Sequence, residues 1–212
     1  MPPEAPADGT PDSRTKILDV AESLFARRGY AGVGLREVAQ EVGLSKSSLF
    51  HHFPTKVALY QEVLARVLDR LDERFTPVLR SDAPHAERLD LLVDALVDGL
   101  AEHPTTARLA LRSLFEEDES APYDPDQPGR FDETLARLVT GFQKLIAEGV
   151  AAGAFRSVSP GHLTQTLIGA TVYHFASAEL GDEILGAPIF SADQVSLRKR
   201  ELRELLRGGI GR

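Results

Sequence analysis

Apolar and polar residues alternate with the period of an α-helix along most of the chain. Between residues 35 and 42 the apolar positions are Leu35, Val38, Ala39 and Val42. This i, i+3, i+4, i+7 spacing is typical of a short amphipathic helix. Gly43 follows where that helix must end, and glycine tolerates the positive φ of a helix terminus best. The pattern predicts a compact helix followed by a tight turn.

A second short helix is expected directly after this turn. Ser45 suits its N-cap, and Leu49 and Phe53 are its apolar positions. Two helices joined by a tight glycine-containing turn form a helix-turn-helix, in which the second helix can enter the DNA major groove. Such a pair can also serve packing alone, so the flanking residues must decide between the two interpretations.

The same periodicity predicts the other elements, and no segment shows a convincing period of two. A first helix is expected over residues 13–28 and a long one over 55–79, followed by helices near 85–102, 104–117, 130–152, 160–180 and 191–207. Four prolines within residues 1–12 predict a disordered tail. The expected fold is all-α, with a three-helix head at 13–56 that contains the helix-turn-helix and a helical body at 57–212.

The charge distribution is compatible with DNA binding although the chain carries a net charge of −8. Residues 13–56 contain seven basic and four acidic side chains, whereas residues 57–212 contain 17 basic and 25 acidic ones. A basic head on an acidic body favours docking in one orientation, because phosphate repels the body.

Several classes of protein are disfavoured by what the sequence lacks. There are no cysteines, which excludes disulfides and zinc fingers and suits a cytoplasmic protein. Neither a secretory signal at the N-terminus nor a membrane-spanning apolar run is expected. No nucleophile elbow, zinc-protease motif, phosphate-binding loop or dinucleotide fingerprint is present, so neither an enzyme nor a cofactor is expected.

Three motifs at fixed spacing support a family resemblance. They are IL-x2-A-x2-LF-x3-GY from Ile17, VA-x2-VGLS from Val38 and HF-x-x-K-x-x-LY from His52. Together they resemble the N-terminal domain of the TetR family of one-component transcriptional regulators. The resemblance implies a double-stranded DNA operator, a small-molecule effector bound in the body, and a homodimer formed through the helices near 160–180 and 191–207.

The resemblance also implies roles for individual residues of the head. Ser45, Lys46, Ser47 and Ser48 open the recognition helix, and Lys46 can donate to guanine or to a phosphate. The further DNA-binding candidates are Arg14, Thr15, Gly34, Arg36, Phe50, His51, His52 and Lys56, of which His52 and Lys56 occupy phosphate-contacting positions of the family.

Three departures from the family pattern predict an altered operator. Phe50 replaces the usual tyrosine, so a phenolic hydrogen bond to phosphate is lost and the ring is left to contact sugar or a thymine methyl group. Val33 and Gly34 replace a Thr-Ser pair, and Ser47 replaces a common glycine. An alternative function is therefore a helical ligand-binding or scaffolding protein with a degenerate head.

The histidines do not predict a metal site. His51 and His52 are adjacent on one helix, so their side chains point about 100° apart and do not easily chelate one ion. His85, His103, His162 and His174 are scattered along the chain.

In the body, the candidate effector-binding residues are Arg108, Leu111, Arg112, Phe115, Phe142 and Tyr173, and they imply an apolar ligand with or without an acidic group. Packing alone would also explain these aromatic residues. The dimer seam is expected at two apolar faces, one with Leu163, Leu167, Ala170, Thr171 and His174, the other with Val195, Leu202, Leu205 and Leu206. An intramolecular core is the alternative interpretation of both faces.

The predicted function is that of a repressor which a small molecule releases from a palindromic operator. In this mechanism the ligand tilts the long helix at 55–79 and changes the separation of the two recognition helices.

Overall fold

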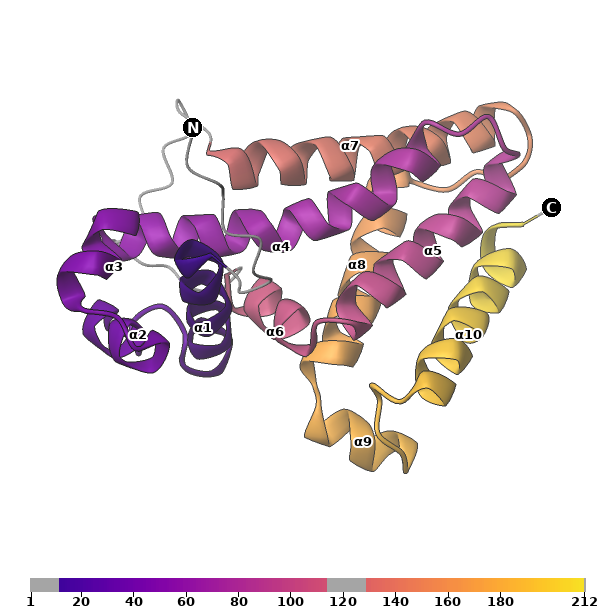
Figure 1. Ribbon diagram of the computed structural model, residues 1–212. Helices are drawn as coiled ribbons and strands as arrows, with labels where there is room; N and C mark the ends of the chain where they lie inside the picture. Colours follow the sequence, from indigo (N-terminus) through magenta and orange to yellow (C-terminus); the bar gives the residue numbers. More distant parts are fainter. Residues whose placement is uncertain (1–11, 114–128, 212) are drawn as a thin grey trace, which may run out of the picture.

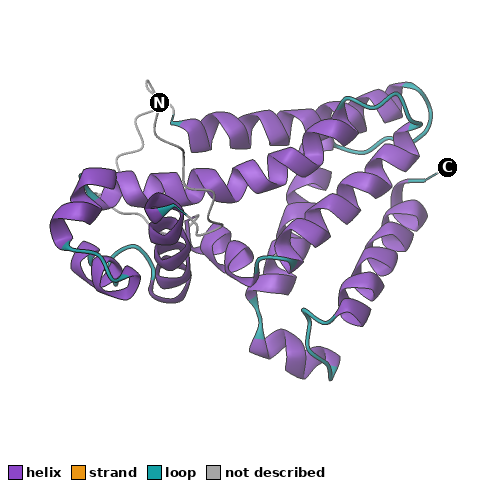
Figure 2. Cartoon of the chain, in the orientation of Figure 1, coloured by secondary structure: helices purple, strands orange, loops and turns teal. Residues whose placement is uncertain are grey.

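The computed structural model describes residues 12–113 and 129–211, and within these ranges the chain forms ten α-helices (Figures 1 and 2). They are α1 (Ser13–Arg28), α2 (Leu35–Val42), α3 (Lys46–His52), α4 (Lys56–Leu79), α5 (His85–Ala101), α6 (Pro104–Ser113), α7 (Arg130–Ala151), α8 (Pro160–Ala176), α9 (Glu179–Leu185) and α10 (Ala192–Ile210). The only β-structure in the described ranges is an isolated bridge between Phe155 and Gly211. The all-α prediction is confirmed.

The helix-turn-helix has the local contacts that its sequence predicts. Gly43 ends α2 in the left-handed region, with φ of 74°. The Ser45 hydroxyl caps α3 by accepting a hydrogen bond from the backbone N–H of Ser48 at 3.1 Å. At the start of α4, the Thr55 hydroxyl accepts in the same way from Ala58 at 3.0 Å. These caps satisfy backbone donors that the first turn of a helix leaves unpaired.

The predicted helix at 160–180 is wrong in its length, because the structure divides it into α8 and α9. Ala178 interrupts the helix with φ of 44° and ψ of −108°. Alanine favours helices, so the break comes from the tertiary packing of this region rather than from local propensity. Gly181 and Ile189 lie buried just beyond it, where the chain turns toward α10.

The long helix α4 runs from the head into the body and packs against α5 and α7 (Figure 1). Its N-terminal half contributes Leu59, Val63 and Val67 to an apolar cluster shared with α1, α2 and α3. Its C-terminal half contributes Phe75 to a second cluster formed with α5, α7, α8 and α10. The head cluster also includes Leu109 of α6, which is fully buried.

The last helix is fixed along α5 by three ion pairs at successive turns. Lys199 contacts Asp98 at 2.8 Å, Arg203 contacts Asp94 at 3.1 Å, and Arg207 pairs with Asp90. The buried leucines of the same helix, Leu202 and Leu206, belong to the body core. No helix within the described ranges is both long enough and apolar enough to cross a membrane.

Candidate nucleic-acid interface and effector cavity

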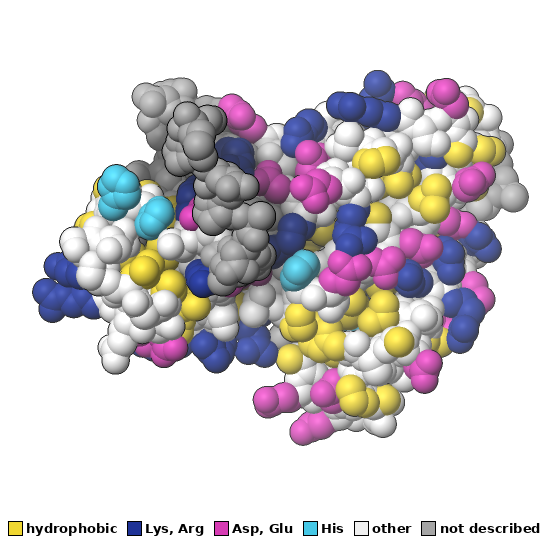
Figure 3. Space-filling model, in the orientation of Figure 1, with side chains coloured by type: hydrophobic (Ala, Val, Ile, Leu, Met, Phe, Trp, Pro, Cys, Tyr) yellow, Lys and Arg dark blue, Asp and Glu magenta, His cyan; other side chains and the backbone are white. Residues whose placement is uncertain are grey.

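The first turn of α3 exposes a cluster of hydroxyl groups beside one cation. The Ser45 Oγ lies 2.9 Å from the Ser47 Oγ and 2.8 Å from the Ser48 Oγ. The Lys46 Nζ lies 5.1 Å from the centroid of the Phe50 ring, which is 36% exposed. Phe50 therefore supports the lysine by a cation–π contact at the place where a tyrosine would offer its own hydroxyl. Space-filling Figure 3 shows basic and histidine side chains at the outer end of the head.

The other candidates of the head lie at the starts of three further helices. Arg14 and Thr15 are in the first turn of α1, Gly34 caps α2 with Arg36 in its first turn, and Lys56 begins α4. All are exposed except Lys56, which is half-buried. Helix N-termini present unpaired N–H groups and a partial positive charge, so this placement suits contact with phosphates.

Two of these cations are already engaged within the head. The Arg14 Nη2 lies 2.8 Å from the Glu62 carboxylate, and both side chains are partly exposed. The Lys56 Nζ lies 3.5 Å from the carbonyl oxygen of Ala31 and 4.1 Å from the centroid of the Tyr30 ring. An exposed ion pair contributes little free energy, so a phosphate can compete for Arg14.

The two adjacent histidines lie in the last turn of α3. His51 is exposed and His52 is half-buried, and their ring centroids are 5.8 Å apart at a steep angle. Nowhere in the described residues do three histidine, aspartate or glutamate side chains gather as metal ligands would.

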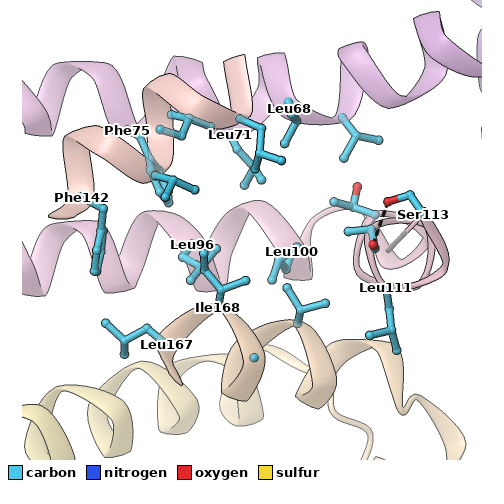
Figure 4. Close-up of a pocket in the computed structure, with 18 of the residues that line it drawn as sticks. Leu68, Leu71, Phe75, Leu96, Leu100, Leu111, Ser113, Phe142, Leu167 and Ile168 are labelled. Carbon is cyan, nitrogen blue, oxygen red and sulfur yellow. Dashed lines mark hydrogen bonds between the residues drawn. The ribbon is translucent and has the colours of Figure 1, made fainter. Parts of the chain in front are cut away.

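The body contains a cavity of about 200 Å³ lined by residues of α4, α5, α6, α7 and α8 (Figure 4). Its wall is mainly apolar and includes Leu68, Leu71, Phe75, Leu96 and Leu100. Thr106, Ser113, Thr164 and Tyr173 are among the lining residues, but the exposed surface of the wall is almost entirely apolar, and the lining residues that the structure describes include no charged side chain. An apolar ligand, or the apolar part of a larger one, would suit this wall.

The structure brings three of the predicted effector-binding residues together at this cavity: Leu111, Phe142 and Tyr173. Arg108 and Arg112 are not among its lining residues, and the Arg112 Nη2 instead donates to the carbonyl oxygen of Arg27 at 3.2 Å. The structure therefore brings neither arginine to the cavity wall, and a contact of Arg108 or Arg112 with an acidic group of a ligand stays a prediction. Phe115 lies outside the described residues.

Sequence reasoning did not identify the contributions of α5 to the wall. Leu96 and Leu100 have the same helical spacing as the core residues around them. No signal in the pattern distinguishes an apolar side chain facing a cavity from one facing another side chain.

The two apolar faces predicted for the dimer seam belong largely to the core of the chain itself. Leu167, Thr171, Leu202 and Leu206 are buried within the chain. The expectation that these residues form the seam is wrong. Leu205 of α10, which was also predicted for the seam, is 71% exposed, and Gly169 and Tyr173 of α8 are exposed as well.

His174 lies at the junction of α8 and α10, where the Arg198 Nη2 donates to the carbonyl oxygen of Ala170 at 2.8 Å. The His174 Nε2 is buried and has no hydrogen-bond partner among the described residues. Burial and the nearby Arg198 lower the pKa of His174 to about 4, so its imidazole is neutral at physiological pH.

Comparison with known proteins identifies both halves of the chain. Residues 17–63 match the bacterial regulatory proteins of the tetR family, and residues 86–206 match a tetracyclin repressor-like C-terminal domain. The HTH-type transcriptional repressor KstR2 of Rhodococcus jostii (strain RHA1) is 30% identical over 161 residues, which is 74% of each chain.

Solved structures share the fold over nearly the whole chain. The ketosteroid transcriptional regulator KstR2 of Mycobacterium tuberculosis has a TM-score of 0.74 at 23% identity, covering 96% of this chain and 97% of its own. FadR of Bacillus subtilis, solved in complex with stearoyl-CoA, has a TM-score of 0.71 at 18% identity, covering 92% and 98%. These proteins are transcriptional regulators rather than enzymes. With the head and the body both matched, the chain belongs to the TetR family of bacterial transcriptional regulators.

Proposed function

We propose that the protein is a homodimeric repressor that binds a palindromic operator and is released from it by an apolar small molecule. The observation that carries this proposal is the presence of two sites in one chain. The head exposes Lys46 and three serine hydroxyls on a capped recognition helix, and the body encloses an apolar cavity.

We assign residues 13–56 to the DNA-binding head and residues 57–212 to the body. The separate apolar clusters of the two regions support this division, although α4 and Leu109 contribute to the head cluster from beyond residue 56. In the head, Lys46 reads base edges or contacts phosphate, while Arg14, Arg36, His52 and Lys56 hold the DNA backbone.

The ligand has an apolar body such as an acyl chain or a fused ring system. A wall without charged side chains among its described residues would not stabilise a buried ionic group, so any charge on the ligand remains outside the cavity. Related regulators named for a ketosteroid and solved with stearoyl-CoA are consistent with this class of molecule.

Two copies associate through the exposed faces of α8 and α10. Gly169 has open space where a Cβ would lie, which permits close approach of a second helix, and Tyr173 of α8 and Leu205 of α10 are exposed side chains with apolar surface. A two-fold dimer presents its recognition helices to two half-sites about 34–36 Å apart.

Selection of bound duplexes from a random DNA pool, followed by titration of the selected duplex, tests the proposal. We expect a palindromic consensus bound by one or more dimers, and release of the duplex by stearoyl-CoA or a ketosteroid such as 4-cholesten-3-one. Absence of any preferred duplex at low ionic strength would overturn the DNA-binding role. A preferred duplex that neither compound class releases would overturn the apolar effector.

A further inference from the structure

One carboxylate of the head is buried at the junction between head and body. Glu22 of α1 is only 5% exposed. Its oxygens accept hydrogen bonds from the Arg66 Nη2 at 2.7 Å, the Arg70 Nη2 at 2.7 Å, the Arg70 Nη1 at 3.1 Å and the Thr105 hydroxyl at 2.9 Å. A buried charge is stable only while it is paired, so this group joins α1, α4 and α6 firmly.

The same network extends to the wall of the cavity. The Arg70 Nη2 that donates to Glu22 also donates to the Thr106 Oγ1 at 3.1 Å. Thr106 is 1% exposed and lines the cavity from α6. Two hydrogen bonds from one guanidinium therefore connect the cavity wall to the first helix of the head.

Helix α6 contacts α1 of the head and α5 and α8 of the body, and it lies beside α1 beneath α4 (Figure 1). Leu109 is buried in the apolar cluster of the head, while the neighbouring Ala110 and Leu111 line the cavity. At the far end of α6, Arg112 donates to the Arg27 carbonyl at the end of α1. A shift of α6 therefore acts on α1 at three places: through the hydrogen bonds to Glu22, through Leu109 in the apolar cluster, and through the bond from Arg112 to Arg27.

We propose that the Glu22–Arg70–Thr106 relay carries the state of the cavity to the DNA-binding head. This inference rests on the proposed function and adds the residues through which its two sites communicate. A ligand that displaces Thr106 moves the Arg70 guanidinium. Separating Arg70 from Glu22 would break two of the four hydrogen bonds to a buried carboxylate, so α1 moves with the guanidinium instead.

Coupling between two sites is reciprocal, so binding of DNA to the head must also change the cavity side of the relay. This consequence can be measured without knowing the natural ligand. The measurement is amide hydrogen exchange in α6, compared between the free full-length protein and the protein saturated with the selected duplex.

Two variants interrupt the relay at its two ends. Thr106→Val removes the hydroxyl at nearly constant volume, and Glu22→Gln removes the charge. Thr171→Val is the matched control, because Thr171 is also fully buried in the body but its hydroxyl donates within its own helix, to the Leu167 carbonyl at 2.8 Å. Far-ultraviolet circular dichroism confirms that each variant is folded.

We expect the duplex to slow exchange in α6 by about fivefold or more in the original protein and in Thr171→Val, and by less than about twofold in Thr106→Val and Glu22→Gln. An unchanged exchange rate in the original protein would overturn the relay, as would full slowing in Thr106→Val. Failure to bind any duplex is a distinct result, which overturns the proposed function and the relay with it.

Discussion

Lys46 and Lys56 are both cations of the head, but their surroundings suit them to different contacts with DNA. Lys46 is exposed in the first turn of the recognition helix, above the Phe50 ring. Lys56 is half-buried at the start of α4 and directed toward the Ala31 carbonyl. The first placement suits a contact that depends on base sequence, and the second suits a contact with the phosphate backbone.

We expect Lys46→Ala to weaken binding to the selected operator by about 10- to 100-fold, because one base contact is lost. Binding to random DNA should change little. Lys56→Ala should weaken binding to the operator and to random DNA by similar factors. It should also lower the salt dependence of the affinity by the amount expected for about one phosphate contact. Fluorescence anisotropy at several salt concentrations measures both quantities. Equal losses on operator and random DNA in both variants would contradict the division.

Glu22 predicts a stability that depends on pH. Burial alone would raise the pKa of its carboxyl, but the bonds from Arg70, Arg66 and Thr105 outweigh burial and lower that pKa below its ordinary value of 4.5. The native state therefore favours the ionised form more than the unfolded chain does. This contribution is fully present above pH 4.5 and is lost as the pH falls through the lowered native pKa.

We expect Glu22→Gln to lower the free energy of unfolding by roughly 3 kcal/mol at pH 7, because two guanidinium groups lose their buried counter-charge. The difference from the original protein should shrink below pH 4.5 as Glu22 itself becomes protonated. Urea unfolding at pH 7 and at several lower pH values measures it. A difference that stays constant with pH would show that the charge of Glu22 is not responsible.

At the scale of elements, local signals predicted the head well. Ser45 and Thr55 are residue types that favour the start of a helix, and their hydroxyls do cap α3 and α4. Gly43 is the residue type that favours a helix end, and it ends α2 with a positive φ. The break at Ala178 has no such signal, because alanine is a helix former and only packing of the folded chain imposes its backbone angles.

The body was harder to predict because apolar periodicity indicates that a side chain is buried but not whether it packs against the same chain, a cavity or a second copy. The family resemblance placed Leu167 and Leu202 in a dimer seam, but both side chains are buried in the core of the chain itself, and apolar spacing does not distinguish the two situations. Leu111 and Phe142 do reach the cavity. Arg112 does not, since it contacts the head, and a contact so distant in sequence leaves no local trace.

The backbone at Ala178 can be tested directly. Ala178→Gly should raise the free energy of unfolding by about 1 kcal/mol, because glycine adopts a positive φ without the steric cost that a Cβ imposes. Thermal or urea unfolding measures the change. Ala136→Gly in the exposed interior of α7 is the control and should lower stability by a similar amount. Destabilisation by both substitutions would mean that the break does not strain residue 178.

At the scale of the whole molecule, charge orients the protein on DNA. The basic excess of residues 13–56 lies at one end, and the acidic excess of residues 57–212 lies in the body. Within the body, the row of ion pairs between α5 and α10 neutralises Asp90, Asp94 and Asp98 and holds α10 in place. These ion pairs fix the orientation of α10, whose outer face is the one proposed above for contact with a second copy.

The outer face of α10 can be tested for its role in the dimer, and simultaneous binding to two DNA half-sites requires that dimer. Leu205 of α10 is 71% exposed, and Leu91 of α5, a helix that is not part of the proposed seam, is 41% exposed. Leu205→Glu would bury an unpaired carboxylate twice per symmetric dimer, so we expect the dimer dissociation constant to rise at least about tenfold. Sedimentation equilibrium measures it.

Leu91→Glu is the matched control and should leave the dimer intact. Because one head reads only one half-site, the loss of dimer in Leu205→Glu should appear again as weaker binding to the full palindrome, with little change on an isolated half-site. If Leu205→Glu remained dimeric at the dilution used for DNA binding, the seam would have to lie elsewhere on the body. If it became monomeric and still bound the palindrome normally, the two half-sites would not be read together.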